Sequence, residues 1–191
     1  MYTNAVLLTQ LQCFMDKNPD VDLHLHLLDS RVDLISEGFD AAVRIGKLDD
    51  SGLYVKKIGT TVIQACASPS YIQKRGMPKD FEDLSNHDCL RYNNLTSGAE
   101  WAAFKDGKEF RKRVHGRWTT NQGDINKRLA LSGEGIAVLP DFIIGDAFET
   151  GALVPVLNDF LFYVSDIHIV YPQKRHMPAS LRALIDHLAG A

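Results

Sequence analysis

The chain has little cysteine, and its cysteines are not arranged to act together. Its 191 residues include only Cys13, Cys66 and Cys89, which are far apart in the sequence. Three such cysteines form neither a disulfide framework nor a CxxC metal pair. Because reduced thiols are the usual state of cysteine in a cytosol, this pattern favours a cytoplasmic protein.

Long apolar runs and a basic excess are also missing. No stretch approaches the roughly 18 apolar residues of a membrane span, and the N-terminus lacks the pattern of a signal peptide, so we expect no membrane contact and no secretion. The net charge is −3 and the isoelectric point is about 6.1. Domains that hold duplex DNA by its phosphates carry a basic excess. We therefore expect no DNA contact from this chain itself.

Motifs for catalysis, metals and cofactors are absent as well. The sequence contains no GxSxG, no glycine-rich phosphate loop and no HExxH. Gly133 and Gly135 follow a predicted helix rather than a strand, which is the wrong order for a dinucleotide fingerprint. His24 and His26 share one face of a predicted strand, but no third or fourth metal ligand accompanies them. We expect no enzyme, no metal and no cofactor.

What the sequence does contain is an alternation of strand and helix patterns. The spacing of Leu7, Leu11 and Phe14 predicts an amphipathic helix that ends before Pro19. The next predicted segments are a strand over 21–28, a helix from Asp29 to Gly38, a strand over 40–45 and two strand-like runs within 53–67. Such β-α-β units imply parallel strands with helices on the faces of the sheet.

The second half of the chain continues this alternation, and residues typical of turns and helix ends mark where its elements begin and end. Ser68 and Pro69 begin a predicted helix that ends at Gly76, and Asp106-Gly107 predicts a type I′ hairpin turn. The remaining predictions are a helix over 125–131, strands over 135–140 and 167–171, and a final helix over 181–188.

Polar residues stand where three predicted helices begin: Thr3-Asn4, Asp29-Ser30 and the segment 121–124. In open α/β sheets, ligands bind at the carboxyl ends of strands, where helix N-termini present free N–H groups. Plain helix capping explains any one of these residues equally well. A binding site requires several of them to converge.

Several segments, in the right order, resemble the effector-binding domain of LysR-type transcription regulators. They are residues 33–46 (DLISEGFDAAVRIG), 48–53 (LDDSGL), 65–72 (ACASPSYI), 121–124 (NQGD), 135–140 (GIAVLP), 153–157 (LVPVL) and 170–172 (VYP). The likeness covers essentially the whole chain.

The resemblance implies an α/β fold like that of the type 2 periplasmic binding proteins, with two Rossmann-like lobes joined by two crossing strands. Lobe one would comprise residues 1–66 and 166–191, and lobe two residues 67–165. No segment of the chain corresponds to the family's winged helix-turn-helix. The domain's own first strand is also missing; in the sheet of this fold it would lie between the strands predicted at 21–28 and 40–45. We therefore expect DNA contact only through a DNA-binding domain absent from this chain. We also expect a gap in the sheet that another segment or a neighbouring chain closes, or that otherwise leads to aggregation.

Matching by motif, the resemblance implies an effector site in the cleft between the lobes. Its residues would be Tyr2, Thr3 and Asn4 in the first helix, Asp29 and Ser30 after the second strand, Ala67 and Ser68 at the first crossing, Tyr92 and Asn93 in lobe two, and Asn121, Gly123 and Asp124 before the helix at 125. Because helix N-termini carry partial positive charge, a small anionic effector is favoured.

The resemblance also implies a homodimer or higher homo-oligomer, in which the first helix and second strand face helix 125–131 of an antiparallel partner. The function it implies is ligand sensing that controls DNA binding and transcription, through different ligand affinities for two arrangements of the protein. The alternative is the solute-binding receptor of a transporter, which has the same fold.

Overall fold

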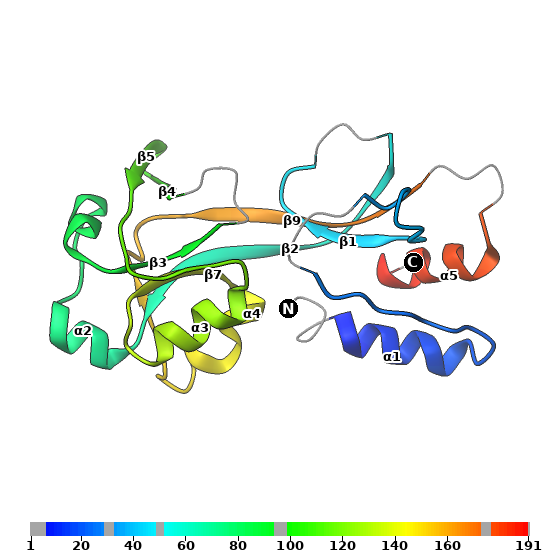
Figure 1. The fold of residues 1–191 in the computed structure, drawn as a ribbon, viewed down its shortest axis with the longest axis horizontal. Helices are drawn as coiled ribbons and strands as arrows, with labels where there is room; N and C mark the ends of the chain where they lie inside the picture. Colours follow the sequence, from blue (N-terminus) through cyan, green and yellow to red (C-terminus); the bar gives the residue numbers. More distant parts are fainter. Residues whose placement is uncertain (1–6, 29–32, 49–51, 94–98, 173–176, 191) are drawn as a thin grey trace. The chain divides into compact units, whose positions relative to one another are not determined.

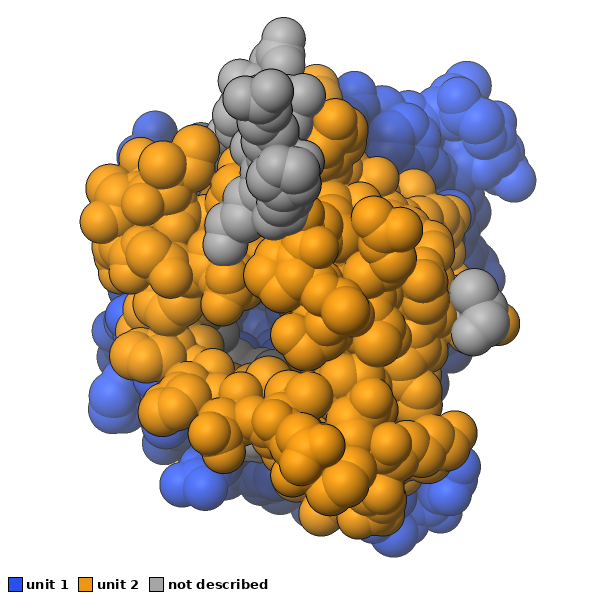
Figure 2. Space-filling model, turned by 90° about the vertical axis from the view of Figure 1, so that its right-hand side faces the viewer, with its two compact units in different colours: residues 1, 62–164 blue, residues 2–61, 165–191 orange. Residues whose placement is uncertain are grey.

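The computed structural model describes residues 7–28, 33–48, 52–93, 99–172 and 177–190. The chain divides into two compact units, which Figure 2 shows in different colours: residues 62–164 form unit 1, and residues 2–61 with 165–191 form unit 2. Both passages between the units lie within strands, β2 (Tyr54–Ala67) and β9 (Tyr163–Tyr171). The lobe boundaries expected from the sequence, at 66/67 and 165/166, stay a prediction.

Unit 1 is built on a mixed sheet (Figure 1). Strand β3 (Cys89–Tyr92) lies parallel to β7 (Ile136–Pro140) on one side and to β6 (Thr119–Thr120) on the other. Strand β2 runs antiparallel to β7 and to β8 (Val154–Val156). The carboxyl ends of β3, β6 and β7 therefore lie at one edge of this sheet, and the carboxyl end of β2 lies at the opposite edge.

Alternating residues of these strands enter two separate cores, as the two-residue period of a strand requires. Ala65 and Cys89 belong to a core shared with Tyr71, Phe81 and Trp101. That core is covered by α2 (Pro69–Arg75), η2 (Phe81–Asn86) and the hairpin of β4 (Glu100–Lys105) and β5 (Lys108–Arg113). The neighbouring residues Cys66 and Leu90 belong instead to a core under α3 (Gly123–Leu131), α4 (Asp141–Ile144) and η3 (Gly145–Ala147).

The turn and cap predictions in unit 1 are confirmed. Asp106 and Gly107 both have positive φ, 51° and 74°, as a type I′ turn demands. The Ser68 side chain accepts a hydrogen bond from the Tyr71 N–H at 3.3 Å, and Pro69 is the first residue of α2. Gly76 follows the helix with φ 85°, which explains why α2 ends there.

Unit 2 packs two helices together with a short strand pair. Helix α1 (Leu8–Lys17) ends before Pro19 as predicted, and α5 (Ala179–Leu188) contacts it. Strand β1 (Ala42–Ile45) runs antiparallel to β9. The shared core contains Leu7, Leu11, Ile169, Leu181, Ile185 and Leu188. Among the described residues, no helix combines the length and apolarity needed to cross a bilayer.

Three predictions for the first third of the chain are wrong. Residues 21–28 form no strand, and Leu25, Leu27 and Leu28 are 46%, 56% and 58% exposed. The apolar alternation is present, but a strand exists only where a neighbour pairs with its N–H and C=O groups, and no such neighbour lies among the described residues. The histidines predicted to share a strand face are thus not on a strand.

The helix predicted up to Gly38 is, in its described part, a single turn over residues 34–38. The Asp33 carboxylate accepts the N–H groups of Ile35 and Ser36, at 2.9 and 3.3 Å, and Gly38 with φ 74° stops the turn. The two runs predicted within 53–67 are one 14-residue strand, β2. Gly59 lies within this strand, and a strand tolerates a glycine at a small cost in stability.

Candidate functional site

Seven of the twelve predicted site residues lie in the described part of the chain, all in unit 1: Ala67, Ser68, Tyr92, Asn93, Asn121, Gly123 and Asp124. The other five, Tyr2, Thr3, Asn4, Asp29 and Ser30, lie outside the described residues.

Five of the seven come together at the edge where β3 and β6 end. Tyr92 is paired in register with Thr120, and the Asn93 N–H donates to the Thr120 carbonyl at 2.9 Å. Asn121 comes directly after β6, and Gly123 and Asp124 are the first two residues of α3. The structure thus places two strand ends and one helix start side by side. We call this end of the strands, formed by residues 92–93 and 120–125, the α3 edge.

Ala67 and Ser68 lie at the opposite edge of the same sheet, because β2 runs antiparallel to β7. Both are buried, and the Ser68 hydroxyl caps α2 while also lying 3.0 Å from the Ser70 hydroxyl. A Cβ added to Gly133, which follows the C-terminal end of α3, would lie 3.6 Å from the Ser68 oxygen. The structure therefore separates this pair from the α3 edge by the length of α3.

The start of α3 presents backbone N–H groups that its N-cap residue does not cap. Gln122 is the N-cap residue, and its side chain makes no capping hydrogen bond. The N–H groups of the first three helical residues have no partner within the helix, and the helix dipole gives this end a partial positive charge. Asp124 places a carboxylate in the same first turn. The α3 edge thus offers both donors and a negative charge.

Close packing holds this helix start in place. A Cβ built on Gly123 would lie 2.5 Å from Cδ1 of Ile143, so the absence of a side chain lets α3 approach α4. At the neighbouring strand, the Asp141 carboxylate accepts the Val62 N–H at 3.2 Å and the Phe142 N–H at 2.7 Å. Asp141 follows β7 directly, so it belongs to the same edge of the sheet.

Two polar residues at the α3 edge were not predicted from the sequence. The Thr120 hydroxyl lies 3.0 Å from the Gln122 carbonyl, 3.3 Å from the Gln122 N–H and 3.0 Å from Oδ1 of Asn126. Asn126 is 1% exposed, and its Nδ2 has no partner among the described residues. The sequence could have indicated a buried Asn126, because it lies four residues before Ala130 and so falls on the same face of the helix, which is the buried face of α3.

Another polar cluster of unit 1 surrounds Tyr71 and is distant from the α3 edge. The Tyr71 hydroxyl accepts the Asp88 N–H at 2.9 Å and lies 3.1 Å from Nδ1 of His87. Burial lowers the pKa of His87, against the opposing effect of the Asp83 carboxylate. Burial also raises the pKa of the Cys66 and Cys89 thiols to about 12, so neither thiol is a nucleophile at neutral pH.

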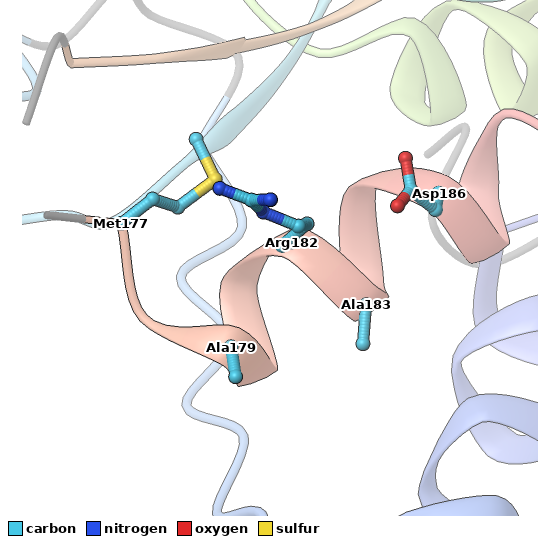
Figure 3. Close-up of a pocket in the computed structure, with 5 residues that line it drawn as sticks. All are labelled: Met177, Ala179, Arg182, Ala183 and Asp186. Atoms are coloured by element: carbon cyan, nitrogen blue, oxygen red, sulfur yellow. The ribbon is translucent and has the colours of Figure 1, made fainter.

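An open depression of about 400 Å³ lies in unit 2 and is lined by none of the predicted site residues. Figure 3 shows the Arg182 side chain reaching toward Met177, with Asp186 one turn further along α5. The Asp186 carboxylate is paired with Lys56 at 3.2 Å. A second depression of about 250 Å³ lies beside Phe148, Leu157 and Phe160 in unit 1.

Within the described ranges, no three His, Cys, Asp or Glu side chains are grouped to hold a metal.

Comparison with known proteins decides the family. The LysR substrate binding domain family matches residues 1–191. The chain belongs to this LysR domain family. An uncharacterized HTH-type transcriptional regulator of Haemophilus influenzae is 37% identical over 174 residues, which are 91% of this chain and 60% of the relative. The chain thus spans about three-fifths of the length of the curated relatives that it matches.

Solved LysR-type regulators confirm the predicted fold class. The regulatory domain of CrgA from Neisseria meningitidis matches at a TM-score of 0.87 and 29% identity, over 99% of this chain and 93% of that domain. Full-length AphB, a virulence activator of Vibrio cholerae, matches at 0.86 and 28%, over 98% of this chain and 64% of that protein. This LysR domain has the type 2 periplasmic-binding-protein-like fold.

Proposed function

We propose that this LysR domain is the effector-sensing part of a bacterial transcription regulator and binds a small molecule at the α3 edge. The parent protein would act in the cytoplasm and bind DNA through a separate domain. The observation that carries this proposal is the meeting of Asn93, Asn121 and Gly123 at one edge, where free helix N–H groups are available.

The effector class that these features favour is a small anion. An exposed helix N-terminus stabilises a negative charge by about 0.3–1 kcal/mol, and by more when the site is partly buried. Asp124 opposes this preference. A thermal-shift panel of small carboxylates, phosphates and neutral aromatics tests the proposal, and we expect the anions to raise Tm most. Stabilisation by neutral or cationic compounds alone would refute the anionic class.

Asn93→Ala provides the matching site test. Asn93 is exposed at the end of β3, so its loss should weaken effector binding with little change in Tm. The control is Asn158→Ala, an exposed asparagine of unit 1 beside the depression at Leu157. If Asn93→Ala lowered Tm clearly and left binding intact, its role would be structural. Ser68 and Ala67 are left out of the proposed site, because Ser68 already caps α2 at the opposite edge.

We further propose a homodimer in which α3 faces α1 of an antiparallel partner. Ile125 and Leu131 on α3 are 38% and 39% exposed, and Leu8 on α1 is 42% exposed. A stable dimer should bury at least about 1,200 Å² in total. Sedimentation at tens of micromolar should show a dimer that Ile125→Asp with Leu131→Asp converts to monomer. A wild-type monomer under these conditions would refute the proposed interface.

The transporter-receptor alternative makes a different prediction. A receptor would work without a DNA-binding domain, whereas a regulator requires one in the same polypeptide. Sequencing the reading frame upstream of Met1 separates the two, because an in-frame helix-turn-helix is expected only for a regulator.

A further inference from the structure

Asn126 occupies a position that folding alone does not explain. It lies on the buried face of α3 and is 1% exposed, yet its Nδ2 has no hydrogen-bond partner among the described residues. A buried donor without a partner reduces stability, whereas an apolar side chain of similar size at such a site is neutral or stabilising. The amide therefore calls for a reason other than packing.

The other end of the same amide points at the α3 edge. Its Oδ1 lies 3.0 Å from the Thr120 hydroxyl, which also lies 3.0 Å from the Gln122 carbonyl. A hydroxyl has one proton and can donate it to only one of these two oxygens. The Gln122 carbonyl also accepts the Asn126 N–H at 3.3 Å, whereas the Thr120 hydroxyl is the donor that reaches Oδ1 of Asn126 among the described residues. Donation of the Thr120 proton to Oδ1 therefore leaves neither oxygen without a donor. The hydroxyl in turn accepts the Gln122 N–H.

We propose that Asn126 is a positioning residue of the α3 edge: its buried amide orients the Thr120 hydroxyl and fixes the turn over 120–122, so that the first N–H groups of α3 face a bound anion. This inference rests on the proposed effector site and adds a residue that does not touch the ligand. Replacing Asn126 should therefore weaken anion binding without lowering the stability of the fold.

The test uses the whole chain with sulfate and acetate as probes, and follows the amide signals of Gly123, Asp124 and Ile125 by NMR. Wild type should show saturable shifts at these three amides. Asn126→Leu should retain the wild-type Tm or exceed it, and should bind about ten-fold more weakly, because one hydrogen bond that organises a charged site is lost. Asn126→Ala serves if leucine does not fit, and Asn158→Leu is the exposed control that should bind as wild type does.

A double-mutant comparison separates positioning from general packing. Thr120→Val should weaken binding about as much as Asn126→Leu, and the double variant should be no weaker than either single variant, because both changes remove the same hydrogen bond. Additive losses, or an unchanged affinity of Asn126→Leu, would overturn the inference and leave the effector site standing. If wild type itself showed no saturable shift with either probe, the anion site would be refuted and this inference with it.

Discussion

Removing the Tyr71 hydroxyl should destabilise unit 1 through two groups at once. In wild type this oxygen accepts the Asp88 N–H at 2.9 Å and lies 3.1 Å from Nδ1 of His87, to which it donates when the neutral ring carries its proton on Nε2. Tyr71 is 3% exposed. Tyr71→Phe retains the ring and leaves both partners without the hydroxyl. A buried polar group left unpaired costs about 1–3 kcal/mol. For a chain of this length, each kcal/mol lowers Tm by about 2–4 °C.

The pH dependence of the same variant makes the prediction sharper. The pKa of His87 is lowered chiefly by burial, so the folded state favours the neutral ring. That contribution to stability is fully present above the unfolded pKa of about 6.5 and is lost as pH falls through the lower folded pKa. Protonation of Nδ1 also removes the acceptor of the Tyr71 proton. Wild type should therefore lose more stability between pH 8 and pH 5.5 than Tyr71→Phe does.

Urea unfolding at the two pH values measures both effects, with Tyr54→Phe as the control. Tyr54 is 47% exposed, so removing its hydroxyl should cost little stability. We expect Tyr71→Phe to be clearly less stable than wild type at pH 8 and the difference to shrink at pH 5.5. Equal stability at pH 8, or a difference that grows on acidification, would refute the hydrogen-bond chain.

Three further predictions concern packing and reactivity. Leu153→Ala should cost about 2–5 kcal/mol of unfolding free energy by thermal or urea denaturation, because Leu153 is fully buried and the change leaves a cavity; a loss below about 1 kcal/mol would mean that this core is loosely packed. Gly116→Ala should fold poorly, because its Cβ would lie 2.1 Å from the Cys89 carbonyl oxygen, while Ser132→Ala on the exposed surface should fold normally. A thiol reagent at pH 8 should label Cys13 quickly, and Cys66 and Cys89 only after denaturation, because the latter two are buried with their pKa raised to about 12; three fast thiols would contradict the burial.

Local chemistry decided which elements could be predicted from the sequence. Ser68-Pro69 and Asp106-Gly107 act through their own backbone and side chains, so α2 and the β4–β5 hairpin follow from a few neighbouring residues. Residues 21–28 were predicted wrongly, because alternating apolar side chains do not by themselves form a strand. A strand also needs a neighbouring strand to pair with its backbone, and the local sequence does not reveal whether one is there. The helix predicted to end at Gly38 is, in its described part, a single turn, because the Asp33 carboxylate accepts the N–H groups of Ile35 and Ser36.

The effector-site residues stay a prediction, but the structure shows which of them lie together and which lie apart. Asn93 and Asn121 come together because β3 and β6 are parallel neighbours, a pairing that was not predicted from the sequence. Asn93 was grouped with Asn121 only through the resemblance to the LysR family. Ala67 and Ser68 were grouped with them because nothing in the residues of β2 reveals that it runs antiparallel to β7. Thr120 and Asn126 were missed, because their roles depend on one contact between a strand end and a buried helix face.

The most direct test of the proposed site is to map a bound effector onto the backbone. A compound that raises Tm in the panel would be titrated into the labelled protein, and the amide shifts of unit 1 would be followed residue by residue. We predict that the largest saturable shifts in unit 1 fall at residues 92–93 and 120–125. Shifts concentrated at residues 67–70 instead, with the α3 edge unchanged, would contradict the site proposed here.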